Sequence, residues 1–228
     1  MNDRDVIREL KSLGAEQTRK TYLRHGVGDK VFGVSYAQLG KLQKKIKVDH
    51  GLAGKLWATG FHEAQILAAM IADPAQMSAK EIDTWARSVS NYMQSDALAG
   101  LVSKTRFAAA TAEKWTRSND EWIGSAGWQV LSWLAQRDAT LPDSFFLSYL
   151  ETIENKIHEA MNRVRYAMNG ALIGIGSRNI KLEKKALAVA AKIGKVKVDH
   201  GDTACKTPDA ASYIRKTAAY KMAKAARG

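Results

Sequence analysis

Cysteine, proline and long apolar runs are all scarce in this 228-residue sequence, which has one cysteine and three prolines. A single cysteine excludes an internal disulfide framework and fits a reducing compartment. The longest unbroken apolar run, residues 66–72, has seven residues, whereas a membrane-spanning helix needs roughly 20. The first residues lack the basic head and apolar stretch of a secretory signal. We therefore expect a soluble, cytoplasmic protein that does not enter a membrane.

Acidic residues are also few, with 23 Asp and Glu against 35 Lys and Arg, for a net charge of +12. Most of the excess lies in residues 177–228, where 13 basic and 4 acidic residues give a net +9. A basic face attracts polyanions, because each neutralised phosphate releases condensed counterions. Nucleic acid is thus the first candidate partner and an anionic membrane surface the second, while a merely solubilising surface is the plainest alternative.

What the sequence does contain is helical periodicity almost throughout. Alanine, leucine and lysine are abundant and favour helix, and apolar side chains recur at intervals of three and four, as in Tyr36, Leu39, Leu42 and Ile46. Ser78 and Glu81 have the spacing of a capping box. We expect helices near 6–10, 36–46, 52–59, 66–72, 79–89, 93–104, 106–117, 121–136, 143–156, 158–175, 179–193 and 209–224. Residues 195–198 are compatible with an extended segment.

A dozen short helices joined by tight turns do not form one four-helix bundle. They suit helix pairs stacked in a row, in which each pair covers the apolar face of its neighbour. We therefore predict an all-α protein, an α-solenoid of stacked helix pairs in a single superhelical domain. Residues 1–194 form the repeats, and residues 195–228 form a basic C-terminal extension packed on or following the last repeat.

Several stretches also carry a recognisable pattern of residues. They are Phe32-Gly33-Val34, the Leu-Trp-Ala-Thr-Gly-Phe-His-Glu-Ala run at 56–64, Asn-Tyr-Met-Gln-Ser-Asp at 91–96, Asn-Arg-Val-Arg-Tyr-Ala-Met-Asn at 162–169, and the segment 198–208. Together these stretches resemble the DNA alkylation repair family, the AlkD-like glycosylases built of HEAT-like repeats. The sequence looks like a divergent sub-branch of that family with a basic C-terminal extension.

The resemblance implies a concave basic surface for double-stranded DNA, including damaged or distorted DNA. Tandem helical repeats of this kind are often monomers, so we also expect a monomer. It also implies hydrolysis of the N-glycosidic bond of cationic N-alkylated purines. A carboxylate beside the sugar stabilises the oxocarbenium-like transition state, and aromatic faces hold the sugar and the cationic base. No cofactor or metal is needed, because the leaving group is already cationic and the reaction consumes only water.

Under this resemblance, Asp96 takes the position of the catalytic carboxylate. Tyr92, one helical turn earlier, stands where the family usually has a tryptophan and would stack on the lesion or sugar. Active members carry an arginine where this chain has Ser125, and a second tryptophan maps near Gly170. The plainer interpretations are that Asp96 is an acid favoured by a helix dipole and that Tyr92 is an ordinary packed aromatic.

The candidate phosphate contacts are basic side chains on two helices and in the extension: Arg163, Arg165, Lys41, Lys44, Lys45, Lys195 and Lys197. For the lysines the alternative is a solvated face, and for one of the arginines it is a carboxylate such as Glu159. Glu63 opens a helix, and we expect it to cap that helix. The segment with Asp199, His200, Asp202 and Cys205 matches no standard zinc spacing, so we expect it to form turns.

Three functions remain open from the sequence. The first is DNA binding in alkylation repair with glycosylase chemistry centred on Asp96. The second is a non-catalytic HEAT-like protein that binds distorted or branched DNA through phosphate contacts. The serine at position 125, where active members carry an arginine, favours this second function. The third, from another class, is a helical protein-interaction scaffold whose basic end meets an acidic partner.

Overall fold

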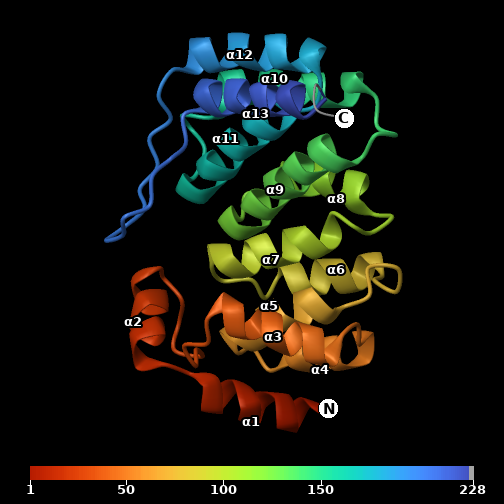
Figure 1. Cartoon of the computed structure of the whole chain (residues 1–228), viewed down its shortest axis with the longest axis vertical. Coiled ribbons are helices and arrows are strands. Elements are labelled where there is room, and N and C mark those ends of the chain that lie inside the picture. The colour runs from red at the N-terminus through yellow and green to blue at the C-terminus, as the bar shows by residue number, and fades with distance from the viewer. Residues whose placement is uncertain (226–228) are drawn as a thin grey trace. The chain divides into compact units, whose positions relative to one another are not determined.

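The computed structural model describes the backbone of residues 1–225 and the side chains of residues 1–217. Residues 1–225 contain α-helices joined by short connections and no β-strand, which confirms the all-α class (Figure 1). The helices are α1 (Asp3–Leu13), α2 (Glu16–Arg24), α3 (Tyr36–Ile46), α4 (His50–Ala58), α5 (His62–Ile71), α6 (Ala79–Ala86), α7 (Tyr92–Val102), α8 (Ala108–Trp115), α9 (Glu121–Arg137), α10 (Asp143–Lys156), α11 (Asn162–Gly176), α12 (Ile180–Ile193) and α13 (Ala210–Ala225). None of these helices, within the described backbone, has both the length and the apolar character to cross a bilayer.

Most of these helices begin where the sequence supplies a short polar side chain to accept the first free backbone N–H groups. Such residues precede α1, α3, α4, α6, α7, α9 and α12: Asn2, Ser35, Asp49, Ser78, Asn91, Asp120 and Asn179. Only one of the two hydrogen bonds of the capping box expected at Ser78 is present. Ser78 Oγ accepts the N–H of Glu81 at 3.2 Å, while the Glu81 carboxylate lies 3.5 Å from His50 Nε2.

The predicted helices are present, with shifted boundaries and one omission. α2 was not predicted, because only Tyr22 of its nine residues is buried and the apolar pattern is correspondingly weak. The helix expected from residue 158 begins at Asn162. Residues 195–198 form neither helix nor strand.

The chain divides into two compact units. Unit 1 comprises Met1–Phe107 with His200–Ala204, and unit 2 comprises Ala108–Asp199 with the chain from Cys205 onward. In unit 1, α5 is the central element and packs against α3, α4 and α7. Nearly every residue of α5 is buried, including the polar side chains of His62, Glu63 and Gln65. Unit 1 therefore places three polar groups inside its core.

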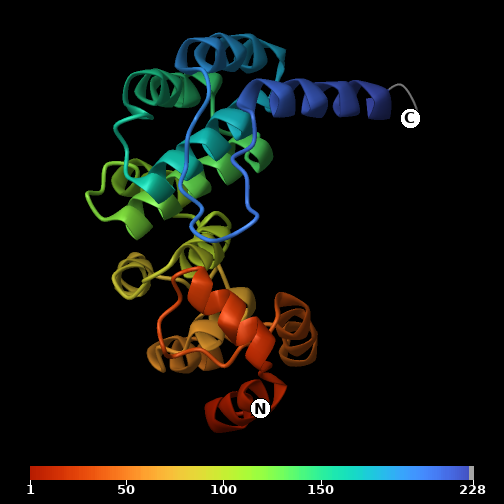
Figure 2. The same ribbon diagram turned by 90° about the vertical axis from the view of Figure 1, so that its left-hand side faces the viewer.

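Unit 2 is built on the long pairing of α9 with α11, to which α8, α10 and α12 are added. α13 packs against α11 and α12, and it lies beside them in both Figure 1 and Figure 2. The contact depends on Gly176, because a Cβ there would lie 2.8 Å from Cδ1 of the fully buried Ile214. Thus the helix of the basic extension closes an apolar face of unit 2, while the predicted domain boundary at residue 194 stays a prediction.

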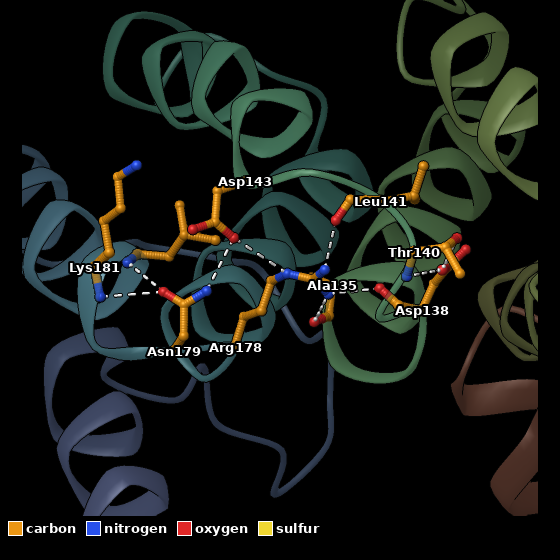
Figure 3. A network of polar contacts seen from close by, with 9 residues as sticks. Ala135, Asp138, Thr140, Leu141, Asp143, Arg178, Asn179 and Lys181 are labelled. Atoms are coloured by element: carbon orange, nitrogen blue, oxygen red, sulfur yellow. Dashed lines mark hydrogen bonds and ion pairs between the residues drawn. The ribbon is translucent and has the colours of Figure 1, made fainter.

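Arg178 fastens the connection between α9 and α10 within unit 2 (Figure 3). Its Nη1 donates to the carbonyl oxygens of Ala135 at 3.1 Å and Asp138 at 2.7 Å, and its Nη2 donates to that of Leu141 at 2.6 Å. Nε lies 3.5 Å from the Asp143 carboxylate. A single guanidinium therefore satisfies the carbonyls left free at the end of α9 and in the turn that follows.

Candidate nucleic-acid interface

Asp96 and Tyr92 lie one turn apart at the start of α7, in unit 1. Asn91 caps this helix by accepting the N–H groups of Met93 and Gln94, each at 3.1 Å. Asp96 is exposed and Tyr92 is half-buried. Because no acidic residue lies in the first turn of α7, stabilisation of the helix dipole does not account for Asp96. The carboxylate is accessible, as a role at a ligand requires.

The ring of Tyr92 is held by a residue that the sequence analysis missed. The Tyr92 hydroxyl lies 2.9 Å from Nδ1 of His25, and the two rings meet edge to face with centroids 5.8 Å apart. His25 is the C-terminal cap of α2, so the unpredicted helix provides this contact. Tyr92 is fixed in orientation and still partly open to solvent.

Two further tyrosines belong to the same region. Tyr22, on α2, is buried and donates its hydroxyl to the carbonyl of Val34 at 2.9 Å. Burial, together with the charge of Glu63, raises the pKa of Tyr22 to about 12. Tyr36 is the first residue of α3 and is 48% exposed. Partial burial of Tyr36 and the nearby charge of Asp96 both raise the pKa of its hydroxyl. We call Tyr22, Tyr36, Tyr92, His25 and Asp96 the tyrosine cluster.

Glu63 shapes the loop that leads into α3. Its fully buried carboxylate accepts the backbone N–H groups of Phe32, Gly33 and Val34 at distances from 2.6 to 3.1 Å. Gly33 has a φ of +87°, and a Cβ there would overlap the carbonyl oxygen of Ala15, so only glycine fits. The expectation that Glu63 caps its own helix was wrong, because α5 begins without a side-chain cap. The carboxylate reaches a more distant set of N–H donors instead.

A buried polar contact joins α5 to α7 and adjoins the tyrosine cluster, because the His62 ring meets the Tyr22 ring edge to face with centroids 5.2 Å apart. His62 is 1% exposed, and burial lowers its pKa to about 4, so the ring is neutral at physiological pH. Its Nδ1 lies 3.4 Å from Nδ2 of Asn91, and the amides of Gln94 and Gln65 are hydrogen-bonded to each other. The residue that caps α7 is therefore itself positioned from the core.

The predicted lysines lie on exposed surfaces. Lys41, Lys44 and Lys45 project from α3 in unit 1, and Lys45 forms an ion pair with Glu9 at 2.9 Å. Neither Lys41 nor Lys44 has an ion-pair partner among the residues whose side chains are described. Both are therefore available to an external anion.

The two predicted arginines are engaged within unit 2. Arg165 donates to the carbonyl oxygens of Lys197 at 2.9 Å, His158 at 3.0 Å and Ala160 at 2.9 Å. The Arg163 guanidinium lies over the Tyr166 ring, 4.8 Å from its centroid. Arg165 thus ties residues 195–198 to α11, next to the exposed side chains of Lys195 and Lys197. Phosphate contact by either arginine stays a prediction.

Ser125 and Gly170 are the two positions at which the sequence departs from the pattern of active family members, and the structure describes the surroundings of both. Ser125 is buried on α9, with 3% of its surface exposed. Gly170, on α11, has open space where a side chain would project. The first position therefore offers neither a charge nor access to a phosphate, and the second lacks the aromatic surface that the resemblance implies.

The segment with Asp199, His200, Asp202 and Cys205 is irregular, with bends at residues 202–204, and the turn-forming role expected for it stays a prediction. Thr203 Oγ1 donates to the His200 carbonyl at 2.9 Å, and Gly201 has a φ of +62°. Cys205 is exposed. Within the described side chains, no three His, Cys, Asp or Glu residues gather in a way that could hold a metal ion.

Comparisons with known proteins extend these observations over nearly the whole chain. The Listeria monocytogenes protein Lmo0209 and the Listeria innocua protein Lin0241 are 32% and 31% identical to it, covering 91% of this chain and 93% of theirs. A solved structure matches with a TM-score of 0.88 at 33% identity, covering 97% of this chain and 95% of its own. That structure represents a family described as related to the HEAT-like repeat DNA glycosylases, with affinity for branched DNA structures.

The stacked helices therefore have a known counterpart, and the fold is the HEAT-like repeat fold. The family model described as DNA alkylation repair enzyme matches residues 6–214, a range that includes the tyrosine cluster as well as α3, α9 and α11. Because this model covers most of the 228 residues, the chain belongs to the DNA alkylation repair enzyme family.

Proposed function

We propose that this protein binds DNA, with a preference for branched over uniform duplex DNA, mainly through contacts with the phosphate backbone. The observation that carries this proposal is the whole-length likeness, at 33% identity, to a protein described as having affinity for branched DNA. In the proposal the protein acts as a monomer in the cytoplasm, and duplex arms of the DNA lie against its exposed lysines.

The charge distribution supports the proposal. The net charge is +12, and Lys41, Lys44, Lys195 and Lys197 are exposed. Contacts of this kind fix the position of a protein on DNA without reading sequence. A protein that reads backbone geometry in this way distinguishes a junction from a straight duplex by the angle between the arms.

The buried position of Ser125 favours binding over hydrolysis. Under the resemblance, active members carry an arginine at this position to hold a phosphate near the lesion, and a buried serine supplies no charge. Electrostatic stabilisation by such fixed groups is usually the largest contribution to catalysis. With this group and the second aromatic replaced, binding is the activity that the remaining residues support best.

Glycosylase activity is the second candidate, because Asp96 is exposed beside the aromatic ring of Tyr92. In that reaction the glycosidic bond of a cationic purine breaks and the bonding electrons leave with the neutral base. Asp96 stabilises the developing positive charge on the sugar, and water adds to the anomeric carbon with loss of a proton.

The experiment that tests the main proposal compares a labelled four-way junction with a duplex of the same arm sequence by fluorescence anisotropy, over a range of salt concentrations. We expect tighter binding to the junction and a steep fall in affinity with salt. Equal affinity for both DNAs would contradict the preference, and absence of binding at low salt would favour the protein scaffold. Release of 7-methylguanine or 3-methyladenine from alkylated DNA by the wild type, abolished in Asp96→Asn, would establish the second candidate.

A further inference from the structure

Tyr36 differs from the other tyrosines of its cluster in being free to contact a ligand. Tyr22 is 7% exposed and its hydroxyl is bound to Val34. Tyr92 is half-buried and held by His25. Tyr36 is 48% exposed although it continues the apolar spacing of Leu39 and Leu42, which are both buried. An exposed aromatic at the first position of a helix contributes little to the core.

The backbone that carries Tyr36 is held firmly. Ser35 caps α3 by accepting the N–H of Gln38 at 3.4 Å. Val34, two residues before Tyr36, donates its N–H to Glu63 at 3.0 Å and accepts the Tyr22 hydroxyl at 2.9 Å. A rigid aromatic side chain gives up little conformational freedom on binding, which is why such residues are effective contacts.

The surroundings of Tyr36 select the kind of ligand. Tyr22 and His25 are three residues apart near the end of α2. Tyr22 is hydrogen-bonded to Val34, in the segment before α3, and His25 to Tyr92, the first residue of α7. Asp96 is exposed on α7, one turn from Tyr92, so the contacts of Tyr22 and His25 bring Tyr36, Tyr92 and Asp96 to one region of unit 1. The charge of Asp96 accordingly raises the pKa of Tyr36. A carboxylate repels a phosphate, whereas it accepts hydrogen bonds from the amino groups of a neutral base. A nucleobase therefore fits beside Tyr36 better than the sugar-phosphate backbone does.

We propose that Tyr36 stacks on an unpaired nucleobase at a DNA branch point and that Asp96 accepts a hydrogen bond from an amino group of that base. This inference rests on the proposed function. In a uniform duplex every base face is covered by its neighbours, so the Tyr36 ring finds no partner. At a branch or gap a base face is open. Tyr36 is thus a specificity-determining residue, while the lysines supply affinity that is the same for any DNA.

The test measures the affinity of three variants for a junction with unpaired bases at its centre and for a duplex of the same arm sequence. Tyr36→Ala is expected to weaken junction binding about tenfold, the effect of losing one base–aromatic stack, and to change duplex binding less than about twofold. Tyr36→Phe keeps the ring and is expected to keep the preference. Tyr213→Ala is the matched control, because Tyr213 is 50% exposed and lies on α13 in unit 2.

A second readout follows the base itself. With 2-aminopurine at the unpaired position, wild type and Tyr36→Phe are expected to change its fluorescence on binding, and Tyr36→Ala to leave it as in free DNA at saturating protein. The inference is overturned if the wild type prefers the junction while Tyr36→Ala and Tyr213→Ala behave alike. If instead the wild type shows no preference for the junction, both the inference and the proposed function are rejected.

Discussion

The buried carboxylate of Glu63 accepts the backbone N–H of Gly33 at 2.6 Å, and these two residues are 30 positions apart in sequence. Phe32 and Val34 donate to the same carboxylate. One side chain of α5 therefore replaces the hydrogen bonds that the loop before α3 cannot make within itself. The position of Tyr36 follows from that contact, because the loop runs directly into α3.

Replacing Glu63 with Gln is expected to destabilise the protein by about 2–3 kcal/mol, because charge-assisted bonds are lost and an amide donor is turned toward N–H donors. Urea denaturation measures the change. Glu151→Gln is the matched control, since Glu151 is exposed on α10, and it is expected to stay within about 0.5 kcal/mol of the wild type. Similar effects of the two substitutions would argue against the role of Glu63.

Lowering the pH is expected to reduce stability through His62. Its pKa falls from 6.5 to about 4 in the folded protein because of burial, so the unfolded chain binds a proton first. The contribution of His62 is therefore fully present above pH 6.5 and is lost as the pH falls toward 4, by about 3 kcal/mol in total. Denaturation at several pH values, for the wild type and His62→Gln, isolates this contribution, since the other titrating groups are common to both. Parallel curves between pH 6.5 and 4 would contradict it.

Replacing Arg178 with Lys is expected to destabilise unit 2 by about 2–3 kcal/mol. A lysine ammonium lacks the planar fork that serves the carbonyls of Ala135, Asp138 and Leu141 together (Figure 3), and the carbonyls that lose a partner carry a cost. Chemical denaturation measures the change. Arg87→Lys, at an exposed position, is the control and is expected to have almost no effect.

Neutralising Lys41 or Lys44 is expected to weaken binding to the duplex and the junction alike. Removing one lysine from a phosphate reduces the slope of log affinity against log salt by about 0.9. Lys41→Gln and Lys44→Gln are compared with Lys45→Gln, because Lys45 is already paired with Glu9 at 2.9 Å and is expected to change the slope less. Anisotropy titrations at several salt concentrations give the slopes, and unchanged slopes for Lys41→Gln and Lys44→Gln would remove these lysines from the interface.

The sequence predicts those helices that turn an apolar side toward the core. The spacing of Leu39 and Leu42 predicts α3, and both are buried. The same criterion failed for α2, which has only Tyr22 in the core. Tyr36 shows the opposite error, because its position in the apolar pattern suggested burial and it is exposed. A periodic pattern reports the average face of a helix, and the first residue can depart from it.

Less of the candidate site than of the fold could be predicted from the sequence. Asp96 and Tyr92 were identified through a family resemblance, and their roles stay predictions. His25 could not have been found, because its partner Tyr92 is 67 residues away and no local pattern links them. Arg165 was chosen for its charge alone, and the carbonyl oxygens of His158 and Ala160 that it binds give no signal in a sequence.

The packing of Ile214 against Gly176 also affects how this protein can be handled. Ending the chain before α13, as a designer might do with a lysine-rich tail, would leave the Gly176 side of α11 and α12 open to water. A shortened protein of that kind is expected to lose solubility as it loses charge, and its aggregation could be mistaken for a failure to engage DNA.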